Sequence, residues 1–344
     1  MISRSGLLAP LGMIEVARML GFPPPMQLVG QQSIAGLLLE DVGRSGVYLL
    51  GFAGGTFYIG LATDVVRRFA QHRRAHGDRV LAFAFLPTHR SDLTVVERDL
   101  IRRAERAGIP LEQTQWKSEI YGKRALDDLF SEADFQRWQR DPSSSFADVP
   151  WVAPQVDVGR VRRDTRRFLG LLSHPQGECV LRLLSRFTRA CLPGARRTVH
   201  DFWSISCLPN TNAATWPRLA CLSAHVMEVL VLGTRKGTPG SLWGFLVCAR
   251  TTLEAAHGSM SDACYTLRAD AVERATYRSA GHDQCVIRFS ANDQAHALLD
   301  QESVRAAAGL LLYRVMRKGF TPYANRHNTV LAEHLLASTS LPGE

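Results

Sequence analysis

The chain has 344 residues, of which 46% are hydrophobic and 21% charged, and its formal net charge is +9. This length predicts more than one domain, and the composition is typical of a globular protein. No apolar run approaches the roughly 20 residues that a membrane-spanning helix needs, and Glu15 and Arg18 interrupt the N-terminal apolar stretch, so we expect no membrane partner, no signal peptide and a cytoplasmic protein.

The positive charge is concentrated in the second half of the chain. Residues 1–150 hold 18 Lys and Arg against 17 Asp and Glu, whereas residues 151–344 hold 23 against 15. Ten arginines and two acids lie between Arg160 and Arg197. Such a field favours a polyanion, because phosphate contacts supply most non-specific nucleic-acid affinity. The alternative is a solvated surface that acids elsewhere balance.

The seven cysteines all lie in the second half, and no two of them form a CxxC pair. An odd number without metal-binding spacing predicts reduced core residues of a cytosolic protein. We therefore expect neither a disulfide framework nor a zinc site.

Residues 1–40 predict an N-terminal extension to which we assign no chemistry. It contains a short helix at Met13–Leu20, a break at Pro23–Pro25 and a second apolar stretch near Ile34–Leu39.

Residues 41–140 predict a compact α/β module. Gly54 and Gly55 supply the positive φ of a tight hairpin, and Asp64 is a good N-cap. Gly108 and Pro110 are helix-stop signals. The expected elements are strands at Gly46–Leu50 and Thr56–Gly60, a helix from Val65 to about Arg74, a strand at Arg79–Leu86, a helix from Asp92 to Gly108, and mostly helical sequence over Leu111–Trp138.

A Pro- and Ser-rich stretch at 141–155 predicts a linker, and residues 156–344 predict an α+β domain. Two Arg-rich helices are expected at Val156–Leu172 and Glu178–Ala190. The remaining predicted elements are strands at Thr198–Cys207, His225–Gly233, Leu242–Ala249, Cys264–Arg268 and Gln284–Phe289, and helices near Val304–Arg317 and Thr329–Ala337.

Two tyrosines in the first module precede a cation and an imidazole. Asp64, Arg68 and His72 are spaced i, i+4, i+8 and so share a helix face, downstream of Tyr48 and Tyr58. A lone Arg or His on a helix is ordinarily a surface residue. A tyrosine hydroxyl is a poor base unless a nearby cation stabilises the phenolate, which a guanidinium could do while also holding a phosphate.

Glu97 falls inside the apolar stripe of the second predicted helix. Carboxylates are seldom buried without a partner, so this position requires a cation. The ordinary partner would be an arginine such as Arg68, in an intramolecular salt bridge.

Gly46-Val47-Tyr48, Tyr58-Ile59-Gly60, Arg68, His72 and Glu97 together resemble the pattern of GIY-YIG nucleases, over residues 45 to 113. The resemblance implies a β-β-α-β-α module with a three-stranded sheet. It also implies phosphodiester hydrolysis by the catalytic residues Tyr48, Tyr58, Arg68, His72 and Glu97. Glu97 would hold one Mg²⁺ or Mn²⁺ per active site. Gln113 lies where the family usually has Asn, which leaves the role of Gln113 open.

The arginines after the linker predict a DNA-binding or specificity domain. Two sets, each on one helix face, suit contact with the phosphate backbone: Arg160, Arg163 and Arg167, and Arg182, Arg186 and Arg189.

The expected function is a metal-dependent endonuclease acting on double-stranded DNA, in bacterial restriction or defence. One alternative is a catalytically inactive DNA-binding or scaffold protein that retains the fold, for which Gln113 is the support. Another is a structure-specific DNA-repair nuclease, although no helix-hairpin-helix or zinc pattern supports it. Cutting both strands with one active site per chain requires a dimer or two binding events, so a homo-oligomer is compatible with this reading.

Overall fold

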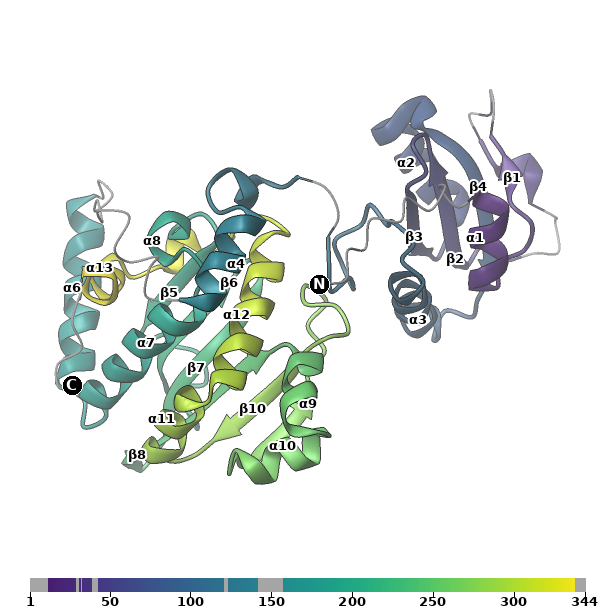
Figure 1. Cartoon of the computed structure of the whole chain (residues 1–344). Helices are drawn as coiled ribbons and strands as arrows, with labels where there is room; N and C mark the ends of the chain where they lie inside the picture. The colour runs from purple at the N-terminus through teal and green to yellow at the C-terminus, as the bar shows by residue number, and fades with distance from the viewer. Residues whose placement is uncertain are drawn as a thin grey trace. The chain divides into compact units, whose positions relative to one another are not determined.

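The structure, a computed structural model, describes residues 12–28, 31, 33–38, 43–120, 123–141 and 157–337. The chain divides into two compact units, Met1–Tyr121 and Gly122–Glu344, which we call the first and second units. Both mix helices with an antiparallel sheet, as the predicted α/β and α+β classes require (Figure 1). Among the described helices, none has the length and apolar character to cross a membrane.

The described strands of the first unit form a four-stranded antiparallel sheet in the order β1-β4-β2-β3. Met26 and Gln27 pair with Phe83 and Ala82 of β4, so the prediction of three strands omitted one. Gly54 and Gly55 have φ of +97° and +75°, as the hairpin turn requires. The strands are β1 (Met26–Gln27), β2 (Gly46–Phe52), β3 (Phe57–Ala62) and β4 (Val80–Pro87).

Helices cover both faces of this sheet. Helix α2 (Val65–His76) packs on one face, and its N-terminus is capped by Asp64, which accepts a hydrogen bond from the Arg67 amide at 3.0 Å. Helices α1 (Met13–Leu20) and α3 (Leu93–Arg106) pack on the other face. Helix α1 therefore belongs to the core of the first unit and is not part of a separate extension. Short 3₁₀ turns lie at Ala35–Leu37 (η1) and Gly77–Arg79 (η2).

Residues 111–138 do not form the continuous helical region that was predicted. Pro110 and Glu112 instead extend along β3, where the Phe57 amide donates to the Pro110 carbonyl at 2.9 Å. The turn η3 (Ala125–Asp128) and helix α4 (Glu132–Arg140) belong to the second unit. The division therefore comes after Tyr121, earlier than expected. The predicted linker, 141–155, lies outside the described residues except for Asp141.

The second unit incorporates α4 through aromatic and ionic contacts. The Phe135 ring stacks on Tyr313 with centroids 4.1 Å apart, and the Arg317 Nε lies 3.0 Å from Asp127 Oδ1. Both partners, Tyr313 and Arg317, come from the region of α12 (Glu302–Met316). Such contacts join segments nearly 190 positions apart, which local sequence signals do not encode.

The described strands of the second unit form a six-stranded antiparallel sheet in the order β5-β6-β7-β8-β10-β9. The strands are β5 (Trp203–Cys207), β6 (Arg218–Ala224), β7 (Met227–Arg235), β8 (Thr238–Cys248), β9 (Ala271–Arg274) and β10 (Cys285–Phe289). The helices are α6 (Val158–Leu172), α7 (Gly177–Cys191), α8 (Ala195–Thr198), α9 (Arg250–His257), α10 (Met260–Thr266), α11 (Asn292–Asp300), α12 and α13 (Thr329–Ala337), with the turn η4 (Ala324–Arg326).

The two faces of this sheet differ in polarity. One face, which includes Ile205, Leu222 and Leu246, packs beneath α7, α11 and α12 (Figure 1). The opposite face carries Ser206, paired in register with Cys221, and then Ser204 paired with Ser223. A polar floor is therefore available on the side away from the helical layer.

Two strand predictions for this unit need correction. Cys264–Arg268 is not a strand, because Ser259 and Asp262 form a capping box that starts α10. Thr198–Cys207 is a strand only from Trp203 onward. Strands β6 and β9 were not predicted. The seven cysteines are free thiols, six of them buried.

Candidate active site

The strand register brings Tyr48 and Tyr58 to one face of the first sheet. Tyr48 is paired with Gly60, and Tyr58 with Leu50, so both rings face α2. Their centroids are 6.1 Å apart. A Cβ atom on Gly60 would lie 2.5 Å from the Tyr48 hydroxyl and 2.7 Å from Tyr58 Cε1. Glycine at this position therefore leaves the room that both rings occupy.

Helix α2 brings Arg68 and His72 to these tyrosines. The Arg68 Nε donates to the Tyr48 hydroxyl oxygen at 3.2 Å, and the same hydroxyl lies 2.7 Å from His72 Nε2. The Tyr58 ring meets the His72 ring edge-on, with centroids 4.8 Å apart. The structure thus brings together four of the five predicted catalytic residues.

The pKa values of Tyr48 and His72 favour the neutral form of both side chains. Burial, more than any other cause, raises the pKa of Tyr48 above its ordinary value, although Arg68 opposes the rise. Burial, followed by the charges of Arg68 and His76, lowers the pKa of His72 to about 4. Tyr48 is therefore a neutral phenol and His72 a neutral imidazole at pH 7. Arg68 can only donate to the Tyr48 oxygen, and in the His72 tautomer that carries its proton on Nδ1, Tyr48 donates to His72 Nε2.

Accessibility differs among the four residues. The side chains of Tyr48 and His72 are 1% and 7% exposed, whereas Tyr58 is half-buried and Arg68 is exposed. A substrate phosphate can therefore approach Arg68 and Tyr58 directly, and Tyr48 lies behind them. The hydrogen bond to Tyr48 raises the pKa of Arg68, which keeps this guanidinium charged.

Glu97 comes from the other layer of the unit. It is buried on α3 beside Leu100 and Ile101, as the apolar stripe predicted. Helices α2 and α3 both contact β3, the edge strand, and the carboxylate of Glu97 adds to the raised pKa of Tyr48. Glu97 is therefore within electrostatic reach of the tyrosine cluster.

The described residues contain no group of three or more His, Cys, Asp or Glu that could hold a metal. One carboxylate is nevertheless compatible with Mg²⁺, which keeps several waters and commonly takes one or two protein carboxylates together with substrate phosphate. Mn²⁺ also prefers carboxylate and water ligands. The donor set is therefore compatible with a single hydrated divalent ion.

Gln113 lies at the outer edge of β3. Its side-chain oxygen accepts a hydrogen bond from the Ile59 amide at 3.2 Å, between the two tyrosine-motif residues Tyr58 and Gly60. Its Nε2 is buried and has no hydrogen-bond partner among the described residues. The Lys117 ammonium, also buried, holds the Leu111 carbonyl at 2.8 Å and so anchors this segment. Gln113 thus supports the strand that carries Tyr58.

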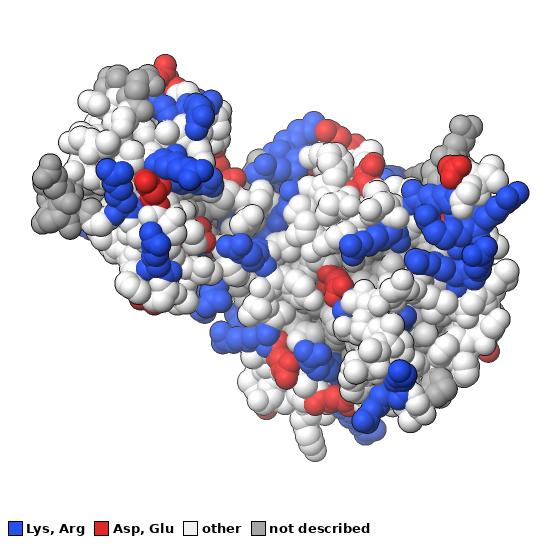
Figure 2. Space-filling model, turned by 180° about the vertical axis from the view of Figure 1, so that it is seen from behind, with Lys and Arg blue, Asp and Glu red and all other residues white. Residues whose placement is uncertain are grey.

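The three α6 arginines differ in exposure, although the sequence predicted one shared phosphate-binding face. Arg160 Nη2 donates to the carbonyls of Ala324 and His327 at 2.6 and 2.9 Å, so its predicted role on an open phosphate-binding face is not supported by its contacts. Arg163 is 54% exposed in its side chain, and Arg167 is half-buried. Lys and Arg gather densely on one side of the second unit (Figure 2).

Among the α7 arginines, Arg186 packs against α11. Arg186 forms an ion pair with Asp300 and contacts His296 Nδ1 at 3.1 Å. Arg189 is half-buried, and burial lowers the pKa of its guanidinium. Arg182 is 54% exposed and 3.9 Å from Glu178. The expected exposure is therefore correct for Arg182 and wrong for Arg186 and Arg189.

No protein-family model, curated protein or solved structure matches this chain. The function must therefore be argued from its own residues.

Proposed function

We propose that this chain is a metal-dependent endonuclease that hydrolyses DNA phosphodiester bonds, with the first unit as its catalytic module. The observation that carries the proposal is the hydrogen-bonded series Arg68–Tyr48–His72, in which a cation and a neutral imidazole share one phenol. The resemblance of the surrounding motifs to GIY-YIG nucleases supplies the reaction type.

In this mechanism a water molecule attacks the phosphorus while the bond from phosphorus to the leaving oxygen breaks. Tyr48 takes a proton from the water as it passes its own proton to His72 Nε2, so the positive charge appears on the imidazole. Arg68 stabilises the phenolate character of Tyr48 and faces the phosphate. Tyr58, the more accessible tyrosine, holds the attacking water.

Glu97 would hold the divalent ion, Mg²⁺ or Mn²⁺. When bound, the ion supplies positive charge against the charge that develops on the phosphate. The position of Glu97 supports this role, because its carboxylate is within electrostatic reach of Tyr48.

The second unit would bind double-stranded DNA. It holds 27 Lys and Arg against 21 Asp and Glu, whereas the first unit holds 14 against 11. Arg163, Arg167 and Arg182 are the members of the predicted set that still suit phosphate contact. We favour bacterial restriction or defence over DNA repair, because no helix-hairpin-helix or zinc pattern, as expected of a repair nuclease, is seen in the sequence. A homo-oligomer would allow both strands to be cut.

The test is cleavage of plasmid DNA by the purified full chain with Mg²⁺. Tyr48→Phe and Glu97→Gln should each lower the rate by about 10²–10⁴-fold. Tyr265→Phe, at a side chain 88% exposed, and Glu15→Gln, on the exposed side of α1, are matched controls that should cut normally. Wild-type protein that binds DNA but cuts no DNA, modified DNA included, would establish the inactive scaffold instead.

A further inference from the structure

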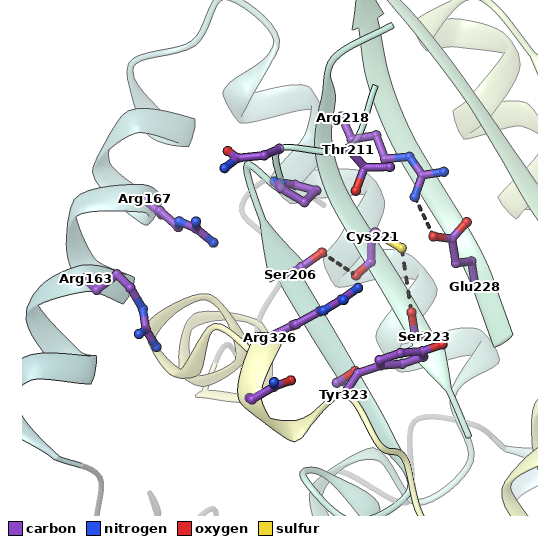
Figure 3. A pocket seen from close by; sticks show the side chains of 14 residues that line it. Arg163, Arg167, Ser206, Thr211, Arg218, Cys221, Ser223, Glu228, Tyr323 and Arg326 are labelled. Carbon is purple, nitrogen blue, oxygen red and sulfur yellow. Dashed lines mark hydrogen bonds and ion pairs between the residues drawn. The ribbon is translucent and has the colours of Figure 1, made fainter. Parts of the chain in front are cut away.

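A cavity of about 550 Å³ opens on the polar face of the six-stranded sheet, and we call it the arginine cavity. Its lining comes from α6, β5, β6, β7, the segment 209–211 and the region of η4, and it includes Arg163 and Arg167 on α6, Arg218 on β6 and Arg326 on η4. In Figure 3, Arg167 points from α6 toward the strands, and Arg326 extends from η4 over the strands. Every lining residue belongs to the second unit.

The charges around the arginine cavity do not balance. Four arginines face one carboxylate, Glu228, which is bound to Arg218 at 2.5 Å. Arg163 is 3.6 Å from Asp164, a carboxylate that also lies 3.8 Å from Arg160. Among the described residues, neither Arg167 nor Arg326 forms an ion pair with an acid. The cavity therefore presents guanidinium groups that an anionic ligand would neutralise.

Guanidinium groups from separate elements suit one ligand chemistry in particular. Their planar donors match phosphate oxygens in pairs, and two or more of them compensate the dianion of a phosphate monoester. The hydroxyl groups of Ser204, Ser206 and Ser223 line the floor between them. The Ser206 hydroxyl donates to the Cys221 carbonyl at 3.3 Å, so a phosphate on this floor would meet charged donors from the arginines beside a polar surface.

The cavity is larger than a phosphate group needs. Its volume lies in the 300–1,000 Å³ range of sites that hold organic ligands, so a bare phosphate would leave most of it filled with water. The amides of Asn210 and Asn325 and the ring of Tyr323 also line it. Side-chain amides and aromatic rings are the groups that bind base edges and base faces. These groups favour a nucleotide over a smaller anion.

The wall that carries Arg326 is held in place. Arg160 binds the carbonyls at both ends of η4, and the Ile205 amide donates to His327 Nδ1 at 3.2 Å. The Arg326 guanidinium lies 5.5 Å from the centre of the Tyr323 ring, a cation–π distance. Burial raises the pKa of the Cys221 thiol in the floor to about 12, so little of it is thiolate at pH 7.

We propose that the arginine cavity binds a nucleotide, with its phosphate held by Arg167 and Arg326 and its base beside Tyr323. The nucleotide is either free or one unit of a nucleic-acid strand, since the two share this chemistry. The proposal does not rest on the proposed nuclease activity, because no residue of the first unit lines the cavity.

The experiment is isothermal titration calorimetry on the full chain at fixed salt. The titrants are the four nucleoside 5′-monophosphates, ribose 5-phosphate, inorganic phosphate and a short single-stranded oligonucleotide. Arg167→Gln and Arg326→Gln should each weaken binding about tenfold or more, because each removes a charged hydrogen bond. Arg166→Gln, an exposed neighbour on α6 outside the cavity, is the matched control and should bind as the wild type does.

Two outcomes support the proposal and tell the sources apart. Binding of a monophosphate at least tenfold tighter than inorganic phosphate, lost in both cavity variants, identifies a free nucleotide. Binding of the oligonucleotide alone, lost in the same variants, identifies a strand unit. Four results would each overturn the proposal. Ribose 5-phosphate or inorganic phosphate could bind as tightly as the nucleotides, no titrant could bind, or Arg166→Gln could weaken binding as much as the two cavity variants do. Thermal unfolding of every variant verifies that the fold is intact.

Discussion

The two units use arginine in different ways. In the first unit, the exposed Arg68 contacts a buried phenol that also contacts a neutral imidazole, so one cation is committed to a small cluster. In the second unit, Arg163, Arg167 and Arg326 line a wide cavity with a polar floor. The first arrangement is suited to moving a proton and the second to holding an anion. An arginine's role follows from the group that its guanidinium contacts, not from its place in a basic run.

The largest expected effect is the loss of DNA cleavage when the His72 imidazole of the first unit is replaced. His72→Gln retains an acceptor for Tyr48 but removes the base, so cleavage should fall by about 10²–10⁴-fold with little change in DNA binding. His89→Gln, at an exposed histidine of the same unit that contacts Ser91, is the control. Equal cleavage by wild type and His72→Gln in a single-turnover assay would remove His72 from the mechanism.

Acid should destabilise both units through buried neutral histidines. The pKa of His72 is lowered to about 4, and burial, with His200 and Arg160, lowers that of His327 to about 3. Both pKa values lie below the ordinary 6.5. The stability that these histidines contribute is therefore complete above pH 6.5, and it is lost in the window in which the pH falls from 6.5 through the lowered pKa values. His327, 1% exposed, contributes up to about 1.4 kcal/mol per pH unit in that window.

Urea unfolding between pH 7 and 4 measures this effect. His327→Gln should flatten the pH dependence of the free energy of unfolding, even if it lowers stability at pH 7. A variant profile as steep as that of the wild type would show that other groups cause the acid sensitivity.

The next largest effect, on both stability and cleavage, is expected from a substitution at Gly60. Gly60→Ala places a methyl group against Tyr48 and Tyr58, so we expect a loss of about 1–3 kcal/mol in the free energy of unfolding, together with slower cleavage. Gly43→Ala, where nothing lies within 4 Å of the added carbon, is the matched control. Normal stability and cleavage in Gly60→Ala would mean that the two rings can move apart without cost.

The smallest effects separate structural from exposed arginines in the second unit. Arg160→Gln removes donors from two carbonyls and should cost about 1–3 kcal/mol of stability. Arg182→Gln should change stability by less than about 0.5 kcal/mol and lower the slope of log K against log salt for DNA by about one. Salt titrations and urea unfolding of both variants measure the difference. An unchanged salt slope in Arg182→Gln would exclude Arg182 from the DNA contact.

Local signals predicted the elements of the first unit well. Helix α1 has the predicted bounds, Asp64 caps α2, and Gly54 and Gly55 make the hairpin turn. These features depend on backbone conformation and on neighbours within a few residues, which the sequence states directly. The burial of Glu97 was also predictable, since helical periodicity places it in an apolar stripe.

Longer-range features were not predictable. The pairing of β1 with β4, the attachment of α4 to α12 and the polar floor of the arginine cavity each join distant segments. Arg218, Tyr323 and Arg326 were missed because no motif or spacing connects them. The strand predicted at Cys264–Arg268 was wrong, because a short apolar run fits a strand or a helix equally well until the helix N-cap before it is recognised.

The sequence by itself determined that Arg68 and His72 share a helix face, through helical periodicity, and its motif spacing predicted their grouping with Tyr48 and Tyr58; the strand register and the packing of α2 on the sheet then place the four side chains together. The tertiary structure alone decided where the second unit's arginines point. Spacing on a helix shows that Arg160, Arg163 and Arg167 share a face, but it does not show whether solvent, a carbonyl or a cavity lies opposite. That depends on segments more than 150 residues away, such as η4, and only the folded chain brings them into contact.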